Sequence, residues 1–146
     1  MKIFIDSSVL IEFESGRRQE LLELLSNSNN DLYINSIVLS EYIYRLLVIL
    51  AEKSPMSVAE SGKIGETLNK HETKLLLSRF EYINIPKLAM LQSIDFMKNY
   101  NLLPNDALII ATCKIENISV LDSYDSDFTK ACLKEGIKLI AKVEDF

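Results

Sequence analysis

The chain has 146 residues, a length that predicts one domain over residues 1–146, and it carries 16 Lys and Arg against 21 Asp and Glu, for a net charge of −5. Hydrophobic residues make up 48% and charged residues 25%, which excludes a disordered chain, a collagen-like repeat and a disulfide scaffold. The acidic balance argues against a protein that grips nucleic acid through a general positive field.

Short apolar segments predict the strands. In chain order they are Lys2–Ile5, Leu32–Ile34, Tyr82–Ile85 (closed by Pro86), Ile118–Leu121 and Lys138–Ile140. Helical periodicity fills the segments between them. The clearest helix is predicted over Ile37–Lys53, with Ser36 as its N-cap and Ser54-Pro55 as its stop.

Further helices are predicted from caps and breakers. The run Ser57-Val58-Ala59-Glu60 matches a capping box, so a helix should open at Ser57. Pro104 fits the first turn of a helix that continues to Asn117, and Gly136 should end another over Ser126–Glu135. Apolar spacing adds two more helices, over Lys74–Arg79 and Leu88–Tyr100.

The alternation of strands and helices predicts the fold class. Strands joined by helices form right-handed crossovers, which gives a three-layer α/β/α fold with a mostly parallel central sheet of about five strands. Ligands of such sheets bind outside the carboxyl ends of the strands. The functional site is therefore expected at that edge.

Cysteine usage and hydropathy predict the compartment. Cys113 and Cys132 have no zinc-binding spacing, and each falls in an apolar helical pattern, so we expect buried free thiols. The N-terminal segment makes a poor signal peptide, because Asp6-Ser7-Ser8 interrupts its apolar run. The longest apolar run, Leu46–Ala51, is far shorter than the ~20 residues of a membrane helix. These features predict a cytoplasmic protein that does not enter a membrane.

Acidic side chains follow two of the predicted strands. Asp6 comes directly after the first strand, and three acids follow the fourth: Asp122, Asp125 and Asp127. Two more acids, Glu41 and Asp106, interrupt apolar helical patterns, where a carboxylate must reach solvent, find a cation or take up a proton.

Each acid taken alone also has a structural interpretation. Asp6 can cap a helix, Asp106 and Asp127 can favour a helix dipole, and Glu41 can pair with Arg45. Together, acids from distant segments that meet at one edge repel one another unless a cation binds between them. Hard oxygen ligands suit Mg²⁺ or Mn²⁺, and the absence of nearby His or Cys argues against zinc.

Four segments carry a family resemblance. They are FIDSSVLIEF, VLSEY, LPNDALIIATC and SYDSDF, and they resemble the four acidic motifs of the PIN-domain ribonucleases in the family's order over nearly the whole chain. Spacing and length are most similar to the VapC-type toxins of VapBC toxin–antitoxin systems. The resemblance implies a PIN-like domain and a divalent-metal-dependent endoribonuclease that hydrolyses RNA phosphodiester bonds with one or two Mg²⁺ or Mn²⁺ ions. It also implies an RNA substrate, a small antitoxin protein and a homodimer.

The resemblance also implies residue roles. The family's four catalytic, metal-binding acids would be Asp6, Glu41, Asp106 and Asp125. Ser8 matches the small hydroxyl residue of the first motif, and Ser123 the hydroxyl residue before the fourth acid, with Asp127 assisting. Which of the neighbouring acids ligates metal stays open at this point, because Asp122 can instead cap the turn.

Other functions use acids at the same edge. A haloacid-dehalogenase-type phosphatase would need an acid two residues after Asp6, where this chain has Ser8, and a response-regulator receiver would need an acidic neighbour beside Asp6. Both fit worse than a nuclease. The remaining alternative is a catalytically inactive PIN-like module that binds RNA or a protein.

Side chains outside the motifs have simpler expectations. His71 is expected to be a solvated surface residue. The basic residues between Lys53 and Arg79 are expected to form a solvated helical face, and the alternative is an arm that contacts RNA phosphates. The aromatic residues are expected in the core, except Tyr124, which either stacks on a base or covers the turn. With Asp6, Glu41, Asp106, Asp125 and Asp127 set aside as a metal site, 16 acids face 16 bases, so the net charge no longer opposes RNA binding.

Overall fold

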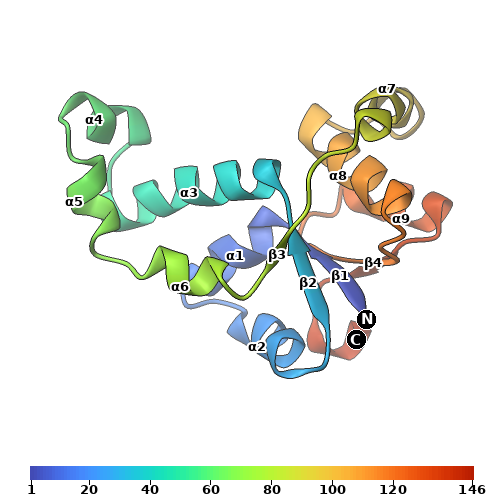
Figure 1. The fold of residues 1–146 in the computed structure, drawn as a ribbon, viewed down its shortest axis with the longest axis horizontal. Coiled ribbons are helices and arrows are strands. Elements are labelled where there is room, and N and C mark those ends of the chain that lie inside the picture. The colour runs from blue at the N-terminus through green and yellow to red at the C-terminus, as the bar shows by residue number, and fades with distance from the viewer.

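A computed structural model describes residues 1–146 as helices packed around a central five-stranded sheet (Figure 1). The strands are β1 (Lys2–Ile5), β2 (Asp31–Ile34), β3 (Glu81–Tyr82), β4 (Val120–Asp122) and β5 (Lys138–Ile140). They lie in the order β3-β2-β1-β4-β5, and every neighbouring pair is parallel. The predicted α/β class with a parallel central sheet is confirmed.

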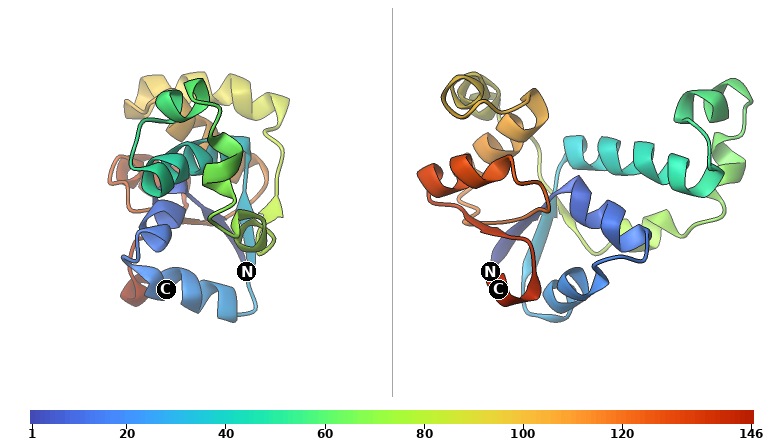
Figure 2. Two further views of the ribbon diagram at one scale, coloured as in Figure 1. Left: turned by 90° about the vertical axis from the view of Figure 1, so that its left-hand side faces the viewer. Right: turned by 180° about the vertical axis from the view of Figure 1, so that it is seen from behind.

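The helices form a layer on each face of the sheet (Figures 1 and 2). They are α1 (Ser7–Glu14), α2 (Gln19–Asn27), α3 (Ser36–Ala51), α4 (Pro55–Glu60), α5 (Ile64–Leu68), α6 (Thr73–Leu77), α7 (Lys87–Tyr100), α8 (Pro104–Ile115) and α9 (Phe128–Glu135), followed by the 3₁₀ turn η1 (Val143–Asp145). The chain first moves from β1 outward to β3 and then returns past β1 to β4 and β5. Right-handed crossovers in these two directions place α1–α6 and α7–α9 on opposite faces.

The core lies between the central strands and the two helical layers. After Lys2, β1 is entirely apolar because both of its faces are covered, and Ile3, Phe4 and Ile5 are fully buried. On one side α3 contributes Val38, Tyr42 and Leu46. On the other side α8 is buried around most of its circumference, as its apolar sequence requires: Ala107, Ile109, Ile110, Ala111, Thr112 and Cys113.

Two predicted N-caps are wrong by a few residues. α3 is capped by Asn35 instead of Ser36, because the Asn35 side-chain oxygen accepts hydrogen bonds from the Ile37 and Val38 amides, each at 3.1 Å. α4 already begins at Pro55, and its cap is Ser54, whose Oγ accepts from the Ser57 amide at 3.2 Å. The Ser57 box therefore lies inside the helix, since the preceding Ser-Pro pair supplies a better start.

Most other boundaries shift by one or two residues. β3 is shorter than predicted and lies at the sheet edge, where Ile83 still donates to the Ile34 carbonyl at 2.9 Å before Pro86 ends the extended segment. Cys113 and Cys132 are free and buried, as expected. No helix of the structure has both the length and the apolar character to cross a membrane.

The helices diverge at the carboxyl ends of the strands. In Figure 2 the two layers separate there, with the first turns of α3 on one side and the start of α8 on the other. α3 continues away from the sheet and carries α4 and α5 at its far end (Figure 1). The first turns of α3 and the start of α8 therefore flank the carboxyl edge from its two sides.

Candidate active site

A cavity of about 790 Å³ lies at this edge of the sheet. The four acids singled out in the sequence all line it, and they come from the end of β1, from α3, from the first turn of α8 and from the β4–α9 loop: Asp6, Glu41, Asp106 and Asp125. Ser8 lines it as well. The fold thus brings together acids that lie far apart in the sequence.

Asp6 is fixed by hydroxyl groups. Its side chain is nearly buried and caps α1 by accepting the Ser8 amide at 3.3 Å. Ser8 Oγ donates to Asp6 Oδ2 at 2.6 Å, and Ser123 Oγ donates to the same oxygen at 2.8 Å. Burial raises the pKa of Asp6, while these hydrogen bonds oppose the rise. Because both hydroxyls bond Oδ2, Oδ1 receives no side-chain donor and is available to a cation.

Glu41 is held from two other elements. Ser7 Oγ donates to Glu41 Oε2 at 2.7 Å, and Asn105 Nδ2 donates to Oε1 at 2.5 Å, so that α1, α3 and α8 meet at one carboxylate. The suggested ion pair between Glu41 and Arg45 is not formed. Each oxygen keeps a free lone pair, since a carboxylate offers about four acceptor sites.

Three acids on the α8 side of the cavity lie close together. Asp106, Asp125 and Asp127 each offer a carboxylate oxygen, and these oxygens lie within 4.8 Å of one another. Burial raises the pKa of Asp106 to about 6, and the negative charges of Asp125, Asp6, Glu41 and Asp127 add to the rise. Like charges at this separation repel one another, and a bound cation would relieve the repulsion.

The β4–α9 loop separates the acids of the fourth motif. Ser123 Oγ accepts the Asp125 amide at 3.0 Å, and Asp125 Oδ1 accepts the Asp127 amide at 2.9 Å, which orients both side chains beside Asp106. Asp122 instead ends β4 and is fully buried, with no hydrogen-bond partner for either carboxyl oxygen. Burial, followed by the charge of Asp6, raises the pKa of Asp122 to about 8. Asp122 does not cap the turn, so that interpretation is wrong.

Several residues of the site were not identified from the sequence. Ser7 and Asn105 both hold Glu41, and each sits directly beside a predicted acid, which is the signal that could have found them. Tyr44 was expected in the core but is 57% exposed and lines the cavity, together with Arg45.

The donor set fits a hard divalent cation. It consists of carboxylate oxygens, with hydroxyl and amide groups behind them, and neither His nor Cys lines the cavity. Mg²⁺ binds oxygen at ~2.1 Å, so two ligand oxygens lie up to ~4.2 Å apart, close to the spread of the Asp106, Asp125 and Asp127 carboxylates. The residues present therefore suit Mg²⁺ or Mn²⁺ better than zinc.

Comparison with known proteins places the chain in a family. The model of the PIN domain matches residues 3–134. The chain belongs to the PIN domain family, an assignment that the parallel sheet and the acidic carboxyl edge support independently.

Sequence relatives and a solved structure show which PIN-domain proteins the chain is similar to. The chain is 31% identical to Ribonuclease VapC2 of Methanocaldococcus jannaschii over 94% of both proteins. It is 34% identical to Ribonuclease VapC6 of the same organism, over 93% of this chain and 96% of that protein. A toxin–antitoxin complex from Klebsiella pneumoniae contains a chain of the same fold, with a TM-score of 0.61, 22% identity and coverage of 95% and 96%. The chain is thus similar over its length to VapC-type ribonucleases.

Proposed function

We propose that this protein is a divalent-metal-dependent endoribonuclease that hydrolyses RNA phosphodiester bonds, with Mg²⁺ or Mn²⁺ as its cofactor. The observation that carries the proposal is the convergence of Asp6, Glu41, Asp106 and Asp125 on one cavity, where three carboxylates lie within 4.8 Å. Its relatives of similar length are ribonucleases by name. The inactive binding module is the alternative outcome of the experiment below.

The residues at the site have different proposed roles: some would bind the ions, and others position those ligands. Asp6, through Oδ1, and the cluster of Asp106 and Asp125 would hold one or two ions, with Glu41 oriented toward them and Asp127 assisting. Ser8 and Ser123 position Asp6 through its Oδ2. When bound, the divalent cation activates water and neutralises the charge that develops on the scissile phosphate. Without it, the carboxylates would repel an RNA backbone.

We further propose that the protein acts as the toxin of a toxin–antitoxin pair, as a homodimer with a small antitoxin protein. The Klebsiella chain of the same fold was solved in a toxin–antitoxin complex. In this chain α7 exposes Leu88 (61%), Leu91 (64%) and Ile94 (50%), which follow one another at spacings of three residues. Exposed apolar stripes of this kind are typical of surfaces that bind a protein partner. The free thiols and the RNA substrate fit the cytoplasm.

The test is metal-dependent cleavage by the purified protein. With Mg²⁺ or Mn²⁺ it should cleave single-stranded or structured RNA, and EDTA should stop the reaction. Asp6→Asn should reduce the initial rate by about 1,000-fold, because loss of a ligand removes several kcal/mol of charge stabilisation. Asp95→Asn is the matched control, since Asp95 is an exposed acid on α7, away from the cavity.

Two results would contradict the proposal. One is unchanged cleavage of a verified substrate by Asp6→Asn. The other is an absence of cleavage together with no rise in melting temperature in Mn²⁺ at concentrations far above any plausible dissociation constant, which would favour the binding module.

A further inference from the structure

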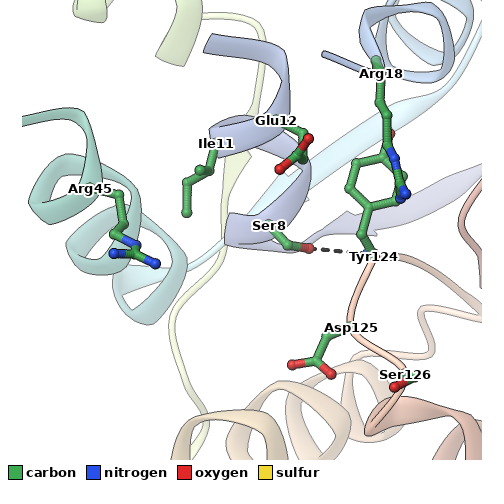
Figure 3. Close-up of a pocket in the computed structure, with 8 residues that line it drawn as sticks. All are labelled: Ser8, Ile11, Glu12, Arg18, Arg45, Tyr124, Asp125 and Ser126. Carbon is green, nitrogen blue, oxygen red and sulfur yellow. Dashed lines mark hydrogen bonds between the residues drawn. The ribbon is translucent and has the colours of Figure 1, made fainter. Parts of the chain in front are cut away.

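A second cavity of about 510 Å³ continues from the acidic one. Ser8, Ile11, Arg45 and Asp125 line both, so the two cavities form one trough along α1. The volume of the second cavity falls in the ~300–1,000 Å³ range typical of ligand sites. Figure 3 shows the residues that line it, with Arg45 on one side of α1, Tyr124 and Arg18 on the other, and Asp125 beyond the start of the helix.

Arg18 and Tyr124 form a preorganised pair at the far end of the trough. The Arg18 guanidinium carbon lies 4.6 Å from the centroid of the Tyr124 ring. The Tyr124 hydroxyl donates to the Arg18 carbonyl at 3.2 Å, and the Tyr124 amide donates to Ser8 Oγ at 3.1 Å, which links the pair to the hydroxyl that binds Asp6. Arg18 adopts a left-handed φ of 49°, a conformation unfavourable for a residue with a side chain. Such backbone positions concentrate at ligand sites.

The charges of this second cavity differ from those of the first. Neither Arg18 nor Arg45 makes a salt bridge. Two acids line its wall: Asp125, which belongs to the acidic cluster, and Glu12, which is already paired with Arg17 through two bonds of 2.8 and 2.9 Å. The trough therefore joins a cluster of acids to two unpaired guanidinium groups. A polyanion that places one phosphate on cations at the acids would find positive charge for the rest of its backbone here.

We propose that the second cavity is a subsite for the nucleotide next to the cleaved phosphate of single-stranded RNA. Its base stacks against the Arg18–Tyr124 pair, and Arg45 binds a backbone phosphate. Guanidinium planes and tyrosine rings are both good partners for an unstacked base, which a single strand offers and a duplex does not. This inference rests on the proposed ribonuclease function and adds to it a substrate-binding surface.

A second cation–aromatic pair provides the matched comparison. Lys2 Nζ lies 5.9 Å from the centroid of the Tyr33 ring, on the neighbouring strands β1 and β2. That pair lines neither cavity and approaches no acid of the site. Lys2→Gln therefore removes a positive charge and a cation–aromatic contact without touching the trough.

The experiment is an abasic scan of a fluorescein-labelled single-stranded RNA that the wild-type protein cleaves. Binding is measured with Mn²⁺ by fluorescence anisotropy on the same RNA carrying a non-cleavable linkage at the cleaved bond, and cleavage is measured with Mn²⁺ on the unmodified RNA. One abasic position beside the cleaved bond should weaken binding by wild type about 5- to 100-fold, the range of one lost stacking contact. Tyr124→Leu should weaken binding of the intact RNA by the same factor, and its affinity should no longer depend on whether that position is abasic. Tyr124→Phe keeps the ring, so it should keep both the affinity of wild type and its sensitivity to that abasic position.

Two arginine variants complete the test. Arg18→Gly removes the guanidinium while favouring the left-handed backbone, so it should keep the fold and mimic Tyr124→Leu. Arg45→Gln should weaken binding by the same factor for every abasic RNA. It should also make the dependence of the logarithm of the binding constant on the logarithm of the salt concentration shallower, by the amount expected for about one lost phosphate contact. Lys2→Gln should match wild type.

The possible failures are distinguishable. If wild type cleaves RNA but Arg18→Gly and Tyr124→Leu keep its sensitivity to every abasic position, the subsite is overturned and the ribonuclease proposal stands. If wild type cleaves no RNA with either metal, the proposed function fails first.

Discussion

Two sites in this protein that contain acids differ in how the negative charge is satisfied. Glu14, at the end of α1, has a side chain only 10% exposed, yet the Tyr42 hydroxyl donates to its Oε1 at 2.8 Å and His71 Nε2 lies 2.8 Å from its Oε2. Asp106, Asp125 and Asp127 receive no comparable set of donors and face one another instead.

The difference separates a structural acid from a ligating one. Around Glu14 the protein supplies both partners, and burial and the bond to Glu14 raise the pKa of Tyr42. At the carboxyl edge the protein supplies donors to Asp6 Oδ2 and to Glu41, but leaves the cluster on α8 unfavourable without a cation. A neutralising substitution should therefore stabilise the cluster and destabilise the Glu14 contact.

The largest effect is expected for Asp106→Asn. Cleavage of RNA should fall by about 1,000-fold because a charged ligand is lost. The metal-free protein should nevertheless melt at a higher temperature than wild type, since the repulsion that raises the pKa of Asp106 to about 6 is removed. Initial rates and melting curves with and without Mn²⁺ measure both. A loss of activity with an equal loss of metal-free stability would mean that Asp106 is a structural acid.

The next largest effect is expected in how the free energy of unfolding depends on pH, through Asp122. The folded chain holds the Asp122 proton up to about pH 8, whereas the ordinary pKa is 3.8, so unfolding releases a proton between these values. The free energy of unfolding of the metal-free protein should therefore be highest near pH 4 and fall as the pH rises to about 8. The slope is about 1.4 kcal/mol per pH unit for one proton, or roughly 3 kcal/mol from pH 5 to 7. Urea unfolding in EDTA at several pH values measures it.

Asp122→Asn is the variant that isolates this contribution. It keeps the shape of the side chain without a charge, so it should match wild type near pH 4 and become increasingly more stable than wild type as the pH rises to about 8. A variant with the same pH slope as wild type would assign the slope to another group. Asp106 contributes in the same direction, but less, since its pKa is raised only to about 6.

A smaller loss is expected at the satisfied acid. Glu14→Gln removes the charge to which the Tyr42 hydroxyl and His71 bond, and should destabilise the fold by about 2 kcal/mol. Because Glu14 does not line the acidic cavity, the shift of melting temperature by Mn²⁺ should stay as in wild type. Glu23→Gln, at an exposed position of α2, is the control. Equal melting temperatures for the two variants would mean that the charge of Glu14 does not stabilise the fold, so Glu14 would not differ in this respect from the acidic cluster on α8.

The elements were predictable because their signals are local. Apolar runs and breakers predicted strands such as Lys138–Ile140 and the start of α8 at Pro104. The four acids were predictable because each carries its own short motif. The family resemblance indicated Asp125 as the fourth acid, but the residues alone did not separate it from Asp122, because the two lie in one run. The decision depends on the strand register, which pairs Asp122 with Ile5 and Ile140 inside the sheet.

What the sequence could not show is contact across long separations. His71 was expected in solvent, but the return of the chain from α5 to α6 places it against Glu14, with its Nδ1 2.9 Å from Thr73 Oγ1. The basic residues between Lys53 and Arg79 line neither cavity of the trough, whereas Arg18 and Arg45, at isolated positions in the sequence, do.

The smallest expected effect tests whether the donors to Glu41 matter. Ser7→Ala removes the hydroxyl that donates to Glu41 Oε2 at 2.7 Å and leaves the Asn105 bond, so Glu41 becomes less firmly oriented. Loss of such a supporting hydrogen bond lowers metal affinity or activity by about 10-fold or somewhat more. Mn²⁺ titration of the cleavage rate measures it. Ser26→Ala is the matched control, because Ser26 Oγ is buried without a partner and its removal should leave the titration unchanged. If Ser7→Ala titrates like Ser26→Ala, the orientation of Glu41 does not depend on α1, and Asn105 alone positions it.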